Sequence, residues 1–387
     1  MHPFSTHVHE PIQKEIIVNR IVLIGLISLI VGCGGGSPTP STTLLPQITG
    51  AWKADSGPEI FDSLGDWNAK FLQFTDKGNG KAFVSQDSSN LKACLPVVYA
   101  LFNANVISIS SKNLINNGAG SFNFELPDAN TLKLIDENGN TQTYKKTTAV
   151  PPESQCESVT SSATLEDLPV STNRSDTALM GDGTNLRVSN GTGSAQVITL
   201  PTGALGASQV MGTALGQFTY GVVMQAGDYW AVCHCGNDSS INRWNPGVAA
   251  AVDTVDTQAD LGKQTSLSGV AFDGTFLWLT GYNYNQAQYL LLKVNAAVEP
   301  DVLVEATPLK FRAQGLTFHN GKLWALVTAF GTSLVQLDST TGKATRVVGL
   351  PAEKLGTSYR SLVSQGGKIF VMRYKSGNSL SIDTFQP

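Results

Sequence analysis

The chain has few charged residues and none of the short motifs that mark the common enzyme classes. Only 14% of the residues are charged, against about 25% in typical globular domains. The net charge of −4 provides no basic footprint for nucleic acid. The sequence contains no Gly-x-Ser-x-Gly elbow, no His-Glu-x-x-His pair, no P-loop and no dinucleotide-binding glycine motif. We therefore expect no nucleic-acid partner, and a catalytic role has no motif to support it.

Long helical patterns are also missing. No long segment has apolar residues at helical spacing, whereas Gly, Ser, Thr and Asn are abundant. Such residues favour turns, and short alternating segments between turns favour strands. We therefore predict an all-β protein, with a small antiparallel barrel over residues 46–150 and a β-propeller over residues 157–387.

An apolar run near the N-terminus has the layout of an export signal. Residues 21–31 are too few to span a bilayer, which needs about 20 residues. Arg20 precedes the run, and a small residue and Cys33 follow it, as in a secretory signal. Two alternatives are an ordinary secretory signal, with Cys33 as an incidental thiol, and an uncleaved anchor, which the short run opposes.

The residues around the end of this run resemble a bacterial lipobox: Ile30-Val31-Gly32-Cys33. The resemblance implies that residues 1–32 are a signal peptide and that Cys33 is acylated and becomes the mature N-terminus. Residues 33–45, rich in Gly, Ser, Thr and Pro, then form a flexible linker. Bacterial lipoproteins carry several acyl chains on this cysteine, which implies firm anchoring in the cell envelope, at the outer membrane.

The remaining cysteines fit an exported protein. Once Cys33 is assigned to lipid, an even number remains: Cys94, Cys156, Cys233 and Cys235. An even number in an oxidising compartment suggests disulfides. A Cys94–Cys156 pair would close a large loop around the first domain and contribute about 3–4 kcal/mol on the chain-entropy model. Cys233 and Cys235 form a second disulfide or remain as two buried thiols.

Residues 46–150 contain short strands joined by tight turns. Residues 71–74 and 81–84 flank a Gly-rich turn, and residues 121–126 alternate apolar and polar side chains. Asn138-Gly139 marks a further hairpin. A meander of this kind tends to close on itself, because closure removes exposed strand edges.

Three features of this segment resemble bacterial lipocalin-like domains. They are Gly50-x-Trp52 on a first strand, a strand that ends in a Gly-rich turn, and a late Leu-x-Leu…Asn-Gly…Tyr pair. The resemblance implies a small barrel that binds an apolar ligand. The alternative is a barrel filled by its own side chains that acts as a spacer or docking module. Residues 136–140 look like part of a calcium loop but lack its downstream Glu, so we interpret them as a turn.

Residues 157–387 contain a repeat. Its copies share a strand, a glycine turn and a second strand that ends in an aromatic residue. Trp278 and Trp324 are 46 residues apart, and so are Trp324 and Phe370, whereas Trp230 precedes Trp278 by 48. A third strand follows each pair. Four short strands per unit indicate propeller blades, because one such sheet cannot bury both of its faces alone.

The repeat length predicts about five blades. Six is the alternative if residues 157–176 conceal another one. The last copy ends after its third strand, so we expect residues 164–170 to supply its outer strand and close the ring. The copies resemble the broad propeller superfamily of bacterial extracytoplasmic proteins. That superfamily includes enzymes, scaffolds and binders, so the resemblance implies a fold without a single function.

Few side chains are candidates for chemistry. In Cys233-His234-Cys235, strand alternation sends His234 to the face opposite the two cysteines, so we predict no metal site. His319 lies at a hairpin position and is interpreted as a surface turn residue. We predict no catalytic residue and no cofactor.

We expect a membrane-anchored extracytoplasmic lipoprotein whose propeller is a binding or scaffold module for a protein or glycan. The alternative is a carbohydrate-active hydrolase or lyase, because five-bladed glycosidase propellers use carboxylates that face the central channel. The acidic candidates for that role are Asp182, Asp228, Asp273 and Glu305. Most acidic residues of this chain stand at turn positions, which the backbone favours in any case.

Overall fold

The computed structural model describes most of the chain after residue 44. The described residues are 45–58, 60, 68–85, 93–103, 105–110, 121–152, 157, 161–168, 177–189, 194–210, 221–225, 227–234, 239–245, 248, 253–256, 265–295, 302–327, 332–351, 357–375 and 379–387. The expected signal peptide, Cys33, nearly all of the linker, Cys156 and Cys235 lie outside them. Within these ranges, no helix has the length and the apolar character that crossing a bilayer requires.

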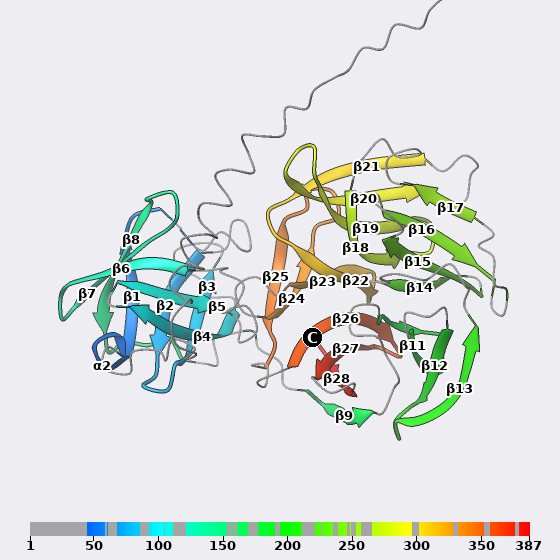
Figure 1. Ribbon diagram of the computed structural model, residues 1–387, viewed down its shortest axis with the longest axis horizontal. Coiled ribbons are helices and arrows are strands. Elements are labelled where there is room, and N and C mark those ends of the chain that lie inside the picture. The colour runs from blue at the N-terminus through cyan, green and yellow to red at the C-terminus, as the bar shows by residue number, and fades with distance from the viewer. Residues whose placement is uncertain are drawn as a thin grey trace, which may run out of the picture. The chain divides into compact units, whose positions relative to one another are not determined.

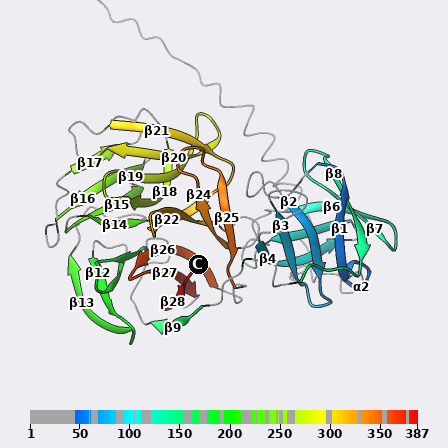
Figure 2. The ribbon, with the colours of Figure 1, turned by 180° about the vertical axis from the view of Figure 1, so that it is seen from behind.

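The described residues between 50 and 147 form a closed barrel of eight strands (Figures 1 and 2). The four-residue helix α2 (Leu45–Ile48) precedes it. The strands are β1 (Gly50–Ser56), β2 (Asn68–Phe74), β3 (Asn79–Ser85), β4 (Ala93–Asn103), β5 (Val106–Ser110), β6 (Ser121–Asp128), β7 (Thr131–Ile135) and β8 (Thr141–Thr147). Each strand pairs antiparallel with the next, and β8 returns to β1 with Ala51 opposite Thr147. Closure leaves no unpaired edge, as the strand meander predicts.

The interior of the barrel is filled by large side chains. Trp52, Leu72 and Tyr144 are fully buried. The Trp52 indole donates a hydrogen bond to the Ile48 carbonyl oxygen at 2.7 Å, and the Tyr144 hydroxyl donates one to Gln142 Oε1 at 2.8 Å. Buried and exposed residues alternate along the first part of β6, as its sequence pattern predicts. The polar groups of these two aromatic rings are therefore satisfied inside the core.

Most of the described residues between 163 and 385 form a propeller of five four-stranded sheets, which confirms the all-β fold and the number of blades. Blade 1 contains β10 (Leu179–Gly181), β11 (Leu186–Ser189), β12 (Ser194–Thr199) and β13 (Ala204–Val210). Blade 2 contains β14 (Val222–Gln225), β15 (Asp228–His234), β16 (Ser239–Trp244) and β17 (Asp253–Asp256). Blade 3 contains β18 (Thr265–Phe272), β19 (Leu277–Asn283), β20 (Gln288–Asn295) and β21 (Val302–Leu309). Blade 4 contains β22 (Ala313–His319), β23 (Lys322–Val327), β24 (Ser333–Leu337) and β25 (Ala344–Gly349).

Blade 5 closes the ring with strands from both ends of the domain. It contains β26 (Thr357–Gln365), β27 (Lys368–Lys375) and β28 (Ser379–Phe385), and its outer strand is β9 (Ala163–Leu168). Ile382 on β28 lies opposite Leu165 on β9. Figure 1 shows β9 beside β28. The outer strand that the sequence pattern assigns to residues 164–170 is therefore found at nearly the same place.

The inner strands of neighbouring blades approach each other closely at glycines. A Cβ atom on Gly269 of β18 would lie 3.0 Å from the Gly315 Cα of β22, and 2.9 Å from Thr280 Oγ1. Such distances are too short for a side chain, so glycine is required where these two strands pack. Apolar side chains of blades 3 and 4 also pack against one another, among them Trp278, Leu291 and Leu316.

Candidate functional site

Two of the four acidic candidates stabilise hairpin turns. The Asp182 carboxylate accepts hydrogen bonds from the backbone amides of Thr184 and Asn185 and pairs with Arg187 at 2.8 Å. Asp273 accepts amide hydrogen bonds in the same way at the equivalent hairpin of blade 3, and it also accepts a hydrogen bond from the Trp278 indole at 2.8 Å. Both residues therefore fix the turn between the inner and second strands of a blade.

The electrostatics of these two turns oppose a role in acid catalysis. Burial alone would raise the pKa of Asp182, but hydrogen bonds from the Asn185 and Thr184 amides and from Arg187 outweigh it and lower the pKa. The same balance of burial against hydrogen bonds lowers the pKa of Asp273. A glycosidase needs one carboxyl group with a raised pKa as its general acid. Neither aspartate meets that requirement.

The other two acidic candidates also have structural partners. Asp228, in the first hairpin of blade 2, pairs with Arg243 at 3.1 Å. Glu305 lies on β21, the outermost strand of blade 3, and accepts a hydrogen bond from Thr307 Oγ1 at 3.3 Å. An outermost strand is the one farthest from the centre of the ring, so Glu305 does not face the channel. Among the described residues, these four carboxylates do not form a catalytic pair.

One of the two histidines of the propeller, His319, is buried at a contact between blades. His319 is 4% exposed, so its interpretation as a surface turn residue is wrong. Its Nδ1 lies 3.0 Å from Ser364 Oγ of blade 5, and the Asn320 amide donates to its Nε2 at 3.1 Å, which places the ring proton on Nδ1. Burial lowers the pKa of His319. His234 and Cys233 lie next to each other at the end of β15. The described part of the chain contains no cluster of three potential metal ligands.

A bulge recurs near the start of the inner strand in the last three blades. The strand register shifts around Ser268, Gln314 and Arg360, which follow one another at intervals of 46 residues. Ser268 Oγ donates a hydrogen bond to the Ala313 carbonyl oxygen at 2.7 Å and so ties blade 3 to blade 4. The Gln314 Oε1 atom is buried and has no hydrogen-bond partner within the described ranges. Bulges redirect side chains and are common beside functional sites.

A pocket of about 310 Å³ lies beside the first of these bulges, between blades 3 and 4. Its aromatic wall is built across three strands, because Ser266 of β18 lies opposite Tyr282 of β19, and Tyr282 lies opposite Tyr289 of β20. Opposite residues in an antiparallel sheet share a face. The two tyrosine rings are 5.0 Å apart, and the ring of Tyr284 lies 5.3 Å from that of Tyr282 in an edge-on arrangement.

The fourth important side chain of this pocket comes from the next blade. Arg312 precedes β22 and lines the same pocket as the tyrosines. Arg312 is exposed and has no ion-pair or hydrogen-bond partner among the described residues. The hydroxyl groups of Tyr282, Tyr284 and Tyr289 also have no hydrogen-bond partner among these residues. The side chain of Tyr284 is 58% exposed. We call this group of four residues the tyrosine pocket. It combines an aromatic wall with polar groups that are free to bind a ligand.

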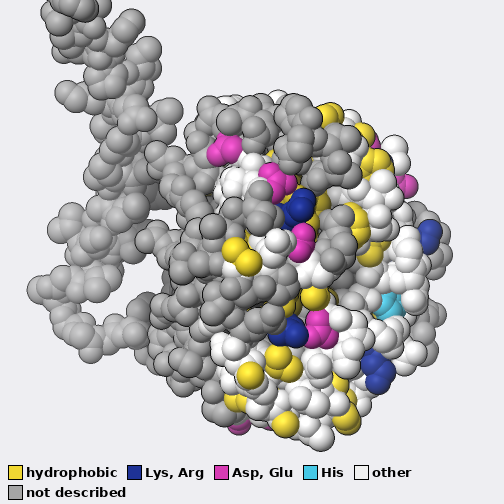
Figure 3. Space-filling view, turned by 90° about the vertical axis from the view of Figure 1, so that its right-hand side faces the viewer, with side chains coloured by type: hydrophobic (Ala, Val, Ile, Leu, Met, Phe, Trp, Pro, Cys, Tyr) yellow, Lys and Arg dark blue, Asp and Glu magenta, His cyan; other side chains and the backbone are white. Residues whose placement is uncertain are grey.

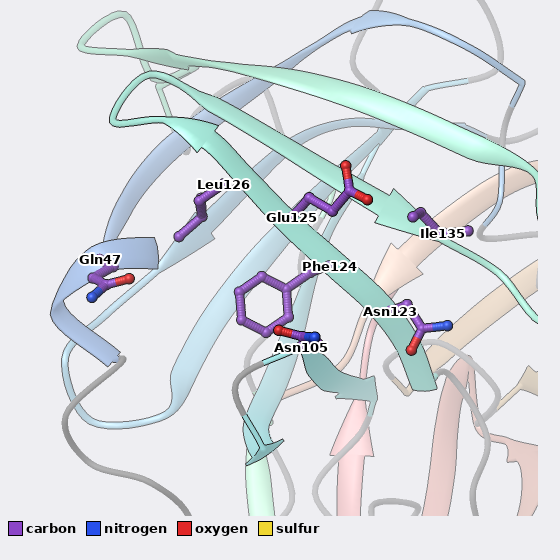
Figure 4. Close-up of a pocket in the computed structure, with 7 residues that line it drawn as sticks. All are labelled: Gln47, Asn105, Asn123, Phe124, Glu125, Leu126 and Ile135. Atoms are coloured by element: carbon purple, nitrogen blue, oxygen red, sulfur yellow. The ribbon is translucent and has the colours of Figure 1, made fainter.

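A second pocket, of about 440 Å³, lies on the barrel (Figure 4). Its lining combines polar side chains, such as Gln47 and Asn123, with Phe124 and Leu126. The side chain of Glu125 is 57% exposed and pairs with Lys133 at 3.6 Å. The lining includes outward-facing residues of β6, so this pocket is a surface groove and not the interior of the barrel.

The surface charge is mixed. On the face of the molecule in Figure 3, described acidic and basic side chains lie beside one another, and no patch of a single sign is visible. Several of the described basic residues are paired with carboxylates, as in Arg187–Asp182 and Arg243–Asp228. Arg312 of the tyrosine pocket differs from these because no carboxylate neutralises it among the described residues.

Sequence reasoning did not find the tyrosine pocket, although part of its signal is present. Tyr282, Tyr284 and Tyr289 lie within eight residues of one another, which is a dense group in a chain with nine tyrosines. Arg312 lies 23 residues after Tyr289, and only the packing of blade 4 on blade 3 brings it into the same pocket.

Comparisons with known proteins add only distant likenesses. No family model and no curated protein sequence matches the chain. Among solved structures, the glutaminyl cyclase of Myxococcus xanthus has 15% identity and a TM-score of 0.25, over 43% of this chain and 90% of that one. The Pan2 WD40 domain of Neurospora crassa has 10% identity and a TM-score of 0.29, over 88% and 91% of the two chains. A mitotic checkpoint complex structure has 10% identity and a TM-score of 0.33, over 100% and 97%.

Proposed function

We propose that the protein is a lipid-anchored protein of the cell envelope whose propeller binds an external ligand in the tyrosine pocket. The observation that carries the proposal is the convergence of three tyrosines and Arg312 from two blades, with their polar ends free of partners among the described residues. Polar groups that a fold leaves unpaired in a concave, aromatic-lined site are typical of ligand pockets. The turn roles of Asp182 and Asp273 favour binding over hydrolysis.

Anchoring rests on the sequence of residues 21–33. The short apolar run, the preceding Arg20 and the lipobox-like residues before Cys33 support cleavage and acylation at this cysteine. Mass spectrometry of the protein purified from membranes tests this: the N-terminal peptide should begin at Cys33 and carry acyl chains. A Cys33→Ala variant should lose membrane attachment. A free thiol at Cys33 in membrane-purified protein would refute the anchor.

The barrel has a supporting role in this proposal. Its lipocalin-like sequence features suggest a ligand carrier, but Trp52, Tyr144 and Leu72 fill the interior, so a spacer or docking module is the favoured interpretation. Native mass spectrometry of the purified protein should find no co-purified lipid beyond the N-terminal acyl chains.

A disulfide between Cys94 and Cys156 is part of the same proposal. One observation supports it: Ala93, the neighbour of Cys94, pairs with Glu157, the neighbour of Cys156. Export to an oxidising compartment would allow such a bond to form and persist. Cys233 and Cys235, which are two residues apart, are proposed as a second redox-sensitive pair.

Binding is tested with the full-length protein in detergent on arrays of glycans and peptides. Wild-type protein should give a selective signal that Tyr284→Ala abolishes. Tyr284→Phe, which keeps the ring, should retain most of it, and Lys368→Ala, an exposed cation in the β26–β27 hairpin, should retain all of it. If every array signal is unchanged by Tyr284→Ala, the tyrosine pocket is not the binding site.

A further inference from the structure

We propose that the ligand of the tyrosine pocket is an acidic saccharide, with a sugar ring stacked on the tyrosines and its carboxylate bound to Arg312. This inference rests on the proposed function and goes further by naming the chemical class of the ligand. It follows from three properties of the pocket, which are its aromatic wall, its uncompensated charge and its size.

The aromatic wall suits a sugar ring. Tyr284 is 58% exposed, and Tyr282 supports it from the side in an edge-on contact with the rings 5.3 Å apart. Tyr289 in turn contacts Tyr282 at 5.0 Å. An aromatic face carries partial negative charge, and the C–H groups of a pyranose ring carry partial positive charge. Stacking therefore places the apolar side of a sugar on tyrosine rings that are already held in position.

The hydroxyl groups of the wall suit the polar edge of the same ring. Tyr282, Tyr284 and Tyr289 each present a hydroxyl group without a partner among the described residues. A tyrosine hydroxyl both donates and accepts a hydrogen bond. Sugar hydroxyl groups have the same dual character, so a sugar can satisfy the wall in several orientations.

The charge of the pocket selects an acidic ligand. Arg312 is exposed and has no carboxylate partner among the described residues, and the described residues that line the pocket include no acidic side chain. A guanidinium group binds a carboxylate through two parallel hydrogen bonds, which gives both energy and orientation. The carboxylate of a uronic acid is attached directly to the sugar ring. One ligand can therefore meet the tyrosines and Arg312 together.

The size of the pocket limits the ligand to a short segment. A volume of about 310 Å³ lies at the lower end of the range of about 300–1,000 Å³ for small-molecule sites. One or two sugar rings fit that volume. A folded protein domain would need a much larger interface, of about 800 Å² on each partner.

The test compares a uronic acid with its neutral counterpart on the full-length protein. Galacturonic acid, its dimer and galactose are titrated into wild-type protein and followed by saturation-transfer NMR and calorimetry. The galacturonate dimer should bind at least 10-fold more tightly than galactose. Arg312→Ala should remove this preference while the weak affinity for galactose persists. Arg312→Lys should restore it in part, because lysine keeps the charge but not the fork of donors.

Variants of the wall and of a distant cation complete the test. Tyr284→Ala should weaken the binding of both sugars, Tyr284→Phe should weaken it less, and Lys368→Ala should change neither. Equal affinity for galacturonate and galactose, or no effect of Arg312→Ala, overturns the inference. If array peptides bind in a manner that depends on Tyr284 while no sugar binds, the inference fails and the proposed binding function stands. If no ligand depends on Tyr284, both fail.

Discussion

Arg373 on β27 and Asp383 on β28 form an ion pair inside the blade that closes the ring. Their exposed fractions are 7% and 3%. The Arg373 guanidinium donates to both Asp383 oxygens, and it also reaches Glu166 of β9 at 3.2 Å. The Thr164 hydroxyl of β9 donates to Asp383 Oδ1 at 2.8 Å. Ion pairs therefore link β27 and β28, from the end of the chain, to β9, which precedes blade 1 in the sequence.

Removal of one partner from this pair should be strongly destabilising. Burial alone would lower the pKa of Arg373, but its hydrogen bonds to Asp383 raise it, so the arginine stays charged. Asp383→Asn would leave that charge buried without its partner, which costs about 3–5 kcal/mol. Urea unfolding measures the loss. The double variant Arg373→Met/Asp383→Leu should recover much of it, and a neutral effect of Asp383→Asn would contradict the role of the pair.

The stability of the propeller should depend on pH through His319. Burial lowers the pKa of His319 below its ordinary value of 6.5. The unfolded chain therefore takes up the proton at a higher pH than the folded chain does, and protonation favours unfolding. The stabilising contribution is complete above about pH 6.5 and decreases as the pH falls toward the folded pKa.

The measurement is the urea midpoint of the wild type and of His319→Gln between pH 7.5 and pH 5.5. The wild type should lose stability over this range, and the variant should lose less, because glutamine keeps a polar contact but does not titrate. Parallel curves for the two proteins would show that His319 does not carry the dependence. The aspartates with lowered pKa values, such as Asp182, lose their contribution only at lower pH.

Close packing of the inner strands should make Gly269 sensitive to substitution. In Gly269→Ala the new methyl group would lie 3.0 Å from the Gly315 Cα and the Leu316 amide nitrogen, both of which belong to the backbone of the next blade. Overpacking of this kind costs about 1–3 kcal/mol. Gly315→Ala is the matched comparison, because its nearest obstacle is the Leu362 Cδ2 atom, the end of a side chain. Thermal unfolding should rank Gly269→Ala as the less stable variant, and the reverse order would contradict this packing.

Loss of the proposed Cys94–Cys156 disulfide should destabilise the protein. Peptide mapping without reductant should yield one cross-linked peptide that contains both cysteines. The variant Cys94→Ala/Cys156→Ala should unfold at a lower urea concentration, with a loss of about 2–4 kcal/mol. A linkage of Cys94 to Cys233 or Cys235 would refute the pairing.

Local patterns predict the propeller better than the barrel. Trp278, Trp324 and Phe370 recur at a fixed interval because each lies near the start of the second strand of a blade, so the count of repeats gives the count of blades. Strand β4 of the barrel has no such signal. It contains Pro96 opposite Lys81 of β3, and proline argues against a strand with neighbours on both sides.

The candidate site could be predicted only in part, because it depends on contacts between blades. His319 has the sequence context of an exposed turn, but Ser364 of blade 5 lies against its ring. Arg312 looks like one of many surface cations until the packing of blade 4 brings it into the same pocket as Tyr282. The sequence pattern of a hairpin predicts contacts within one blade. The contacts of His319 and Arg312 are made with a neighbouring blade, so that pattern does not predict them.

The β9–β28 pairing also has a consequence for the order of folding. Thr164 and Asp383 are 219 residues apart, so the pairing of β9 with β28 closes the longest loop in the ring. Because the chain is synthesised from its N-terminus, β9 is made before the four other blades and must wait for its partner. Until then blade 1 and blade 4 each keep one open flank. We therefore expect the ring to become resistant to proteases only once β28 has paired with β9.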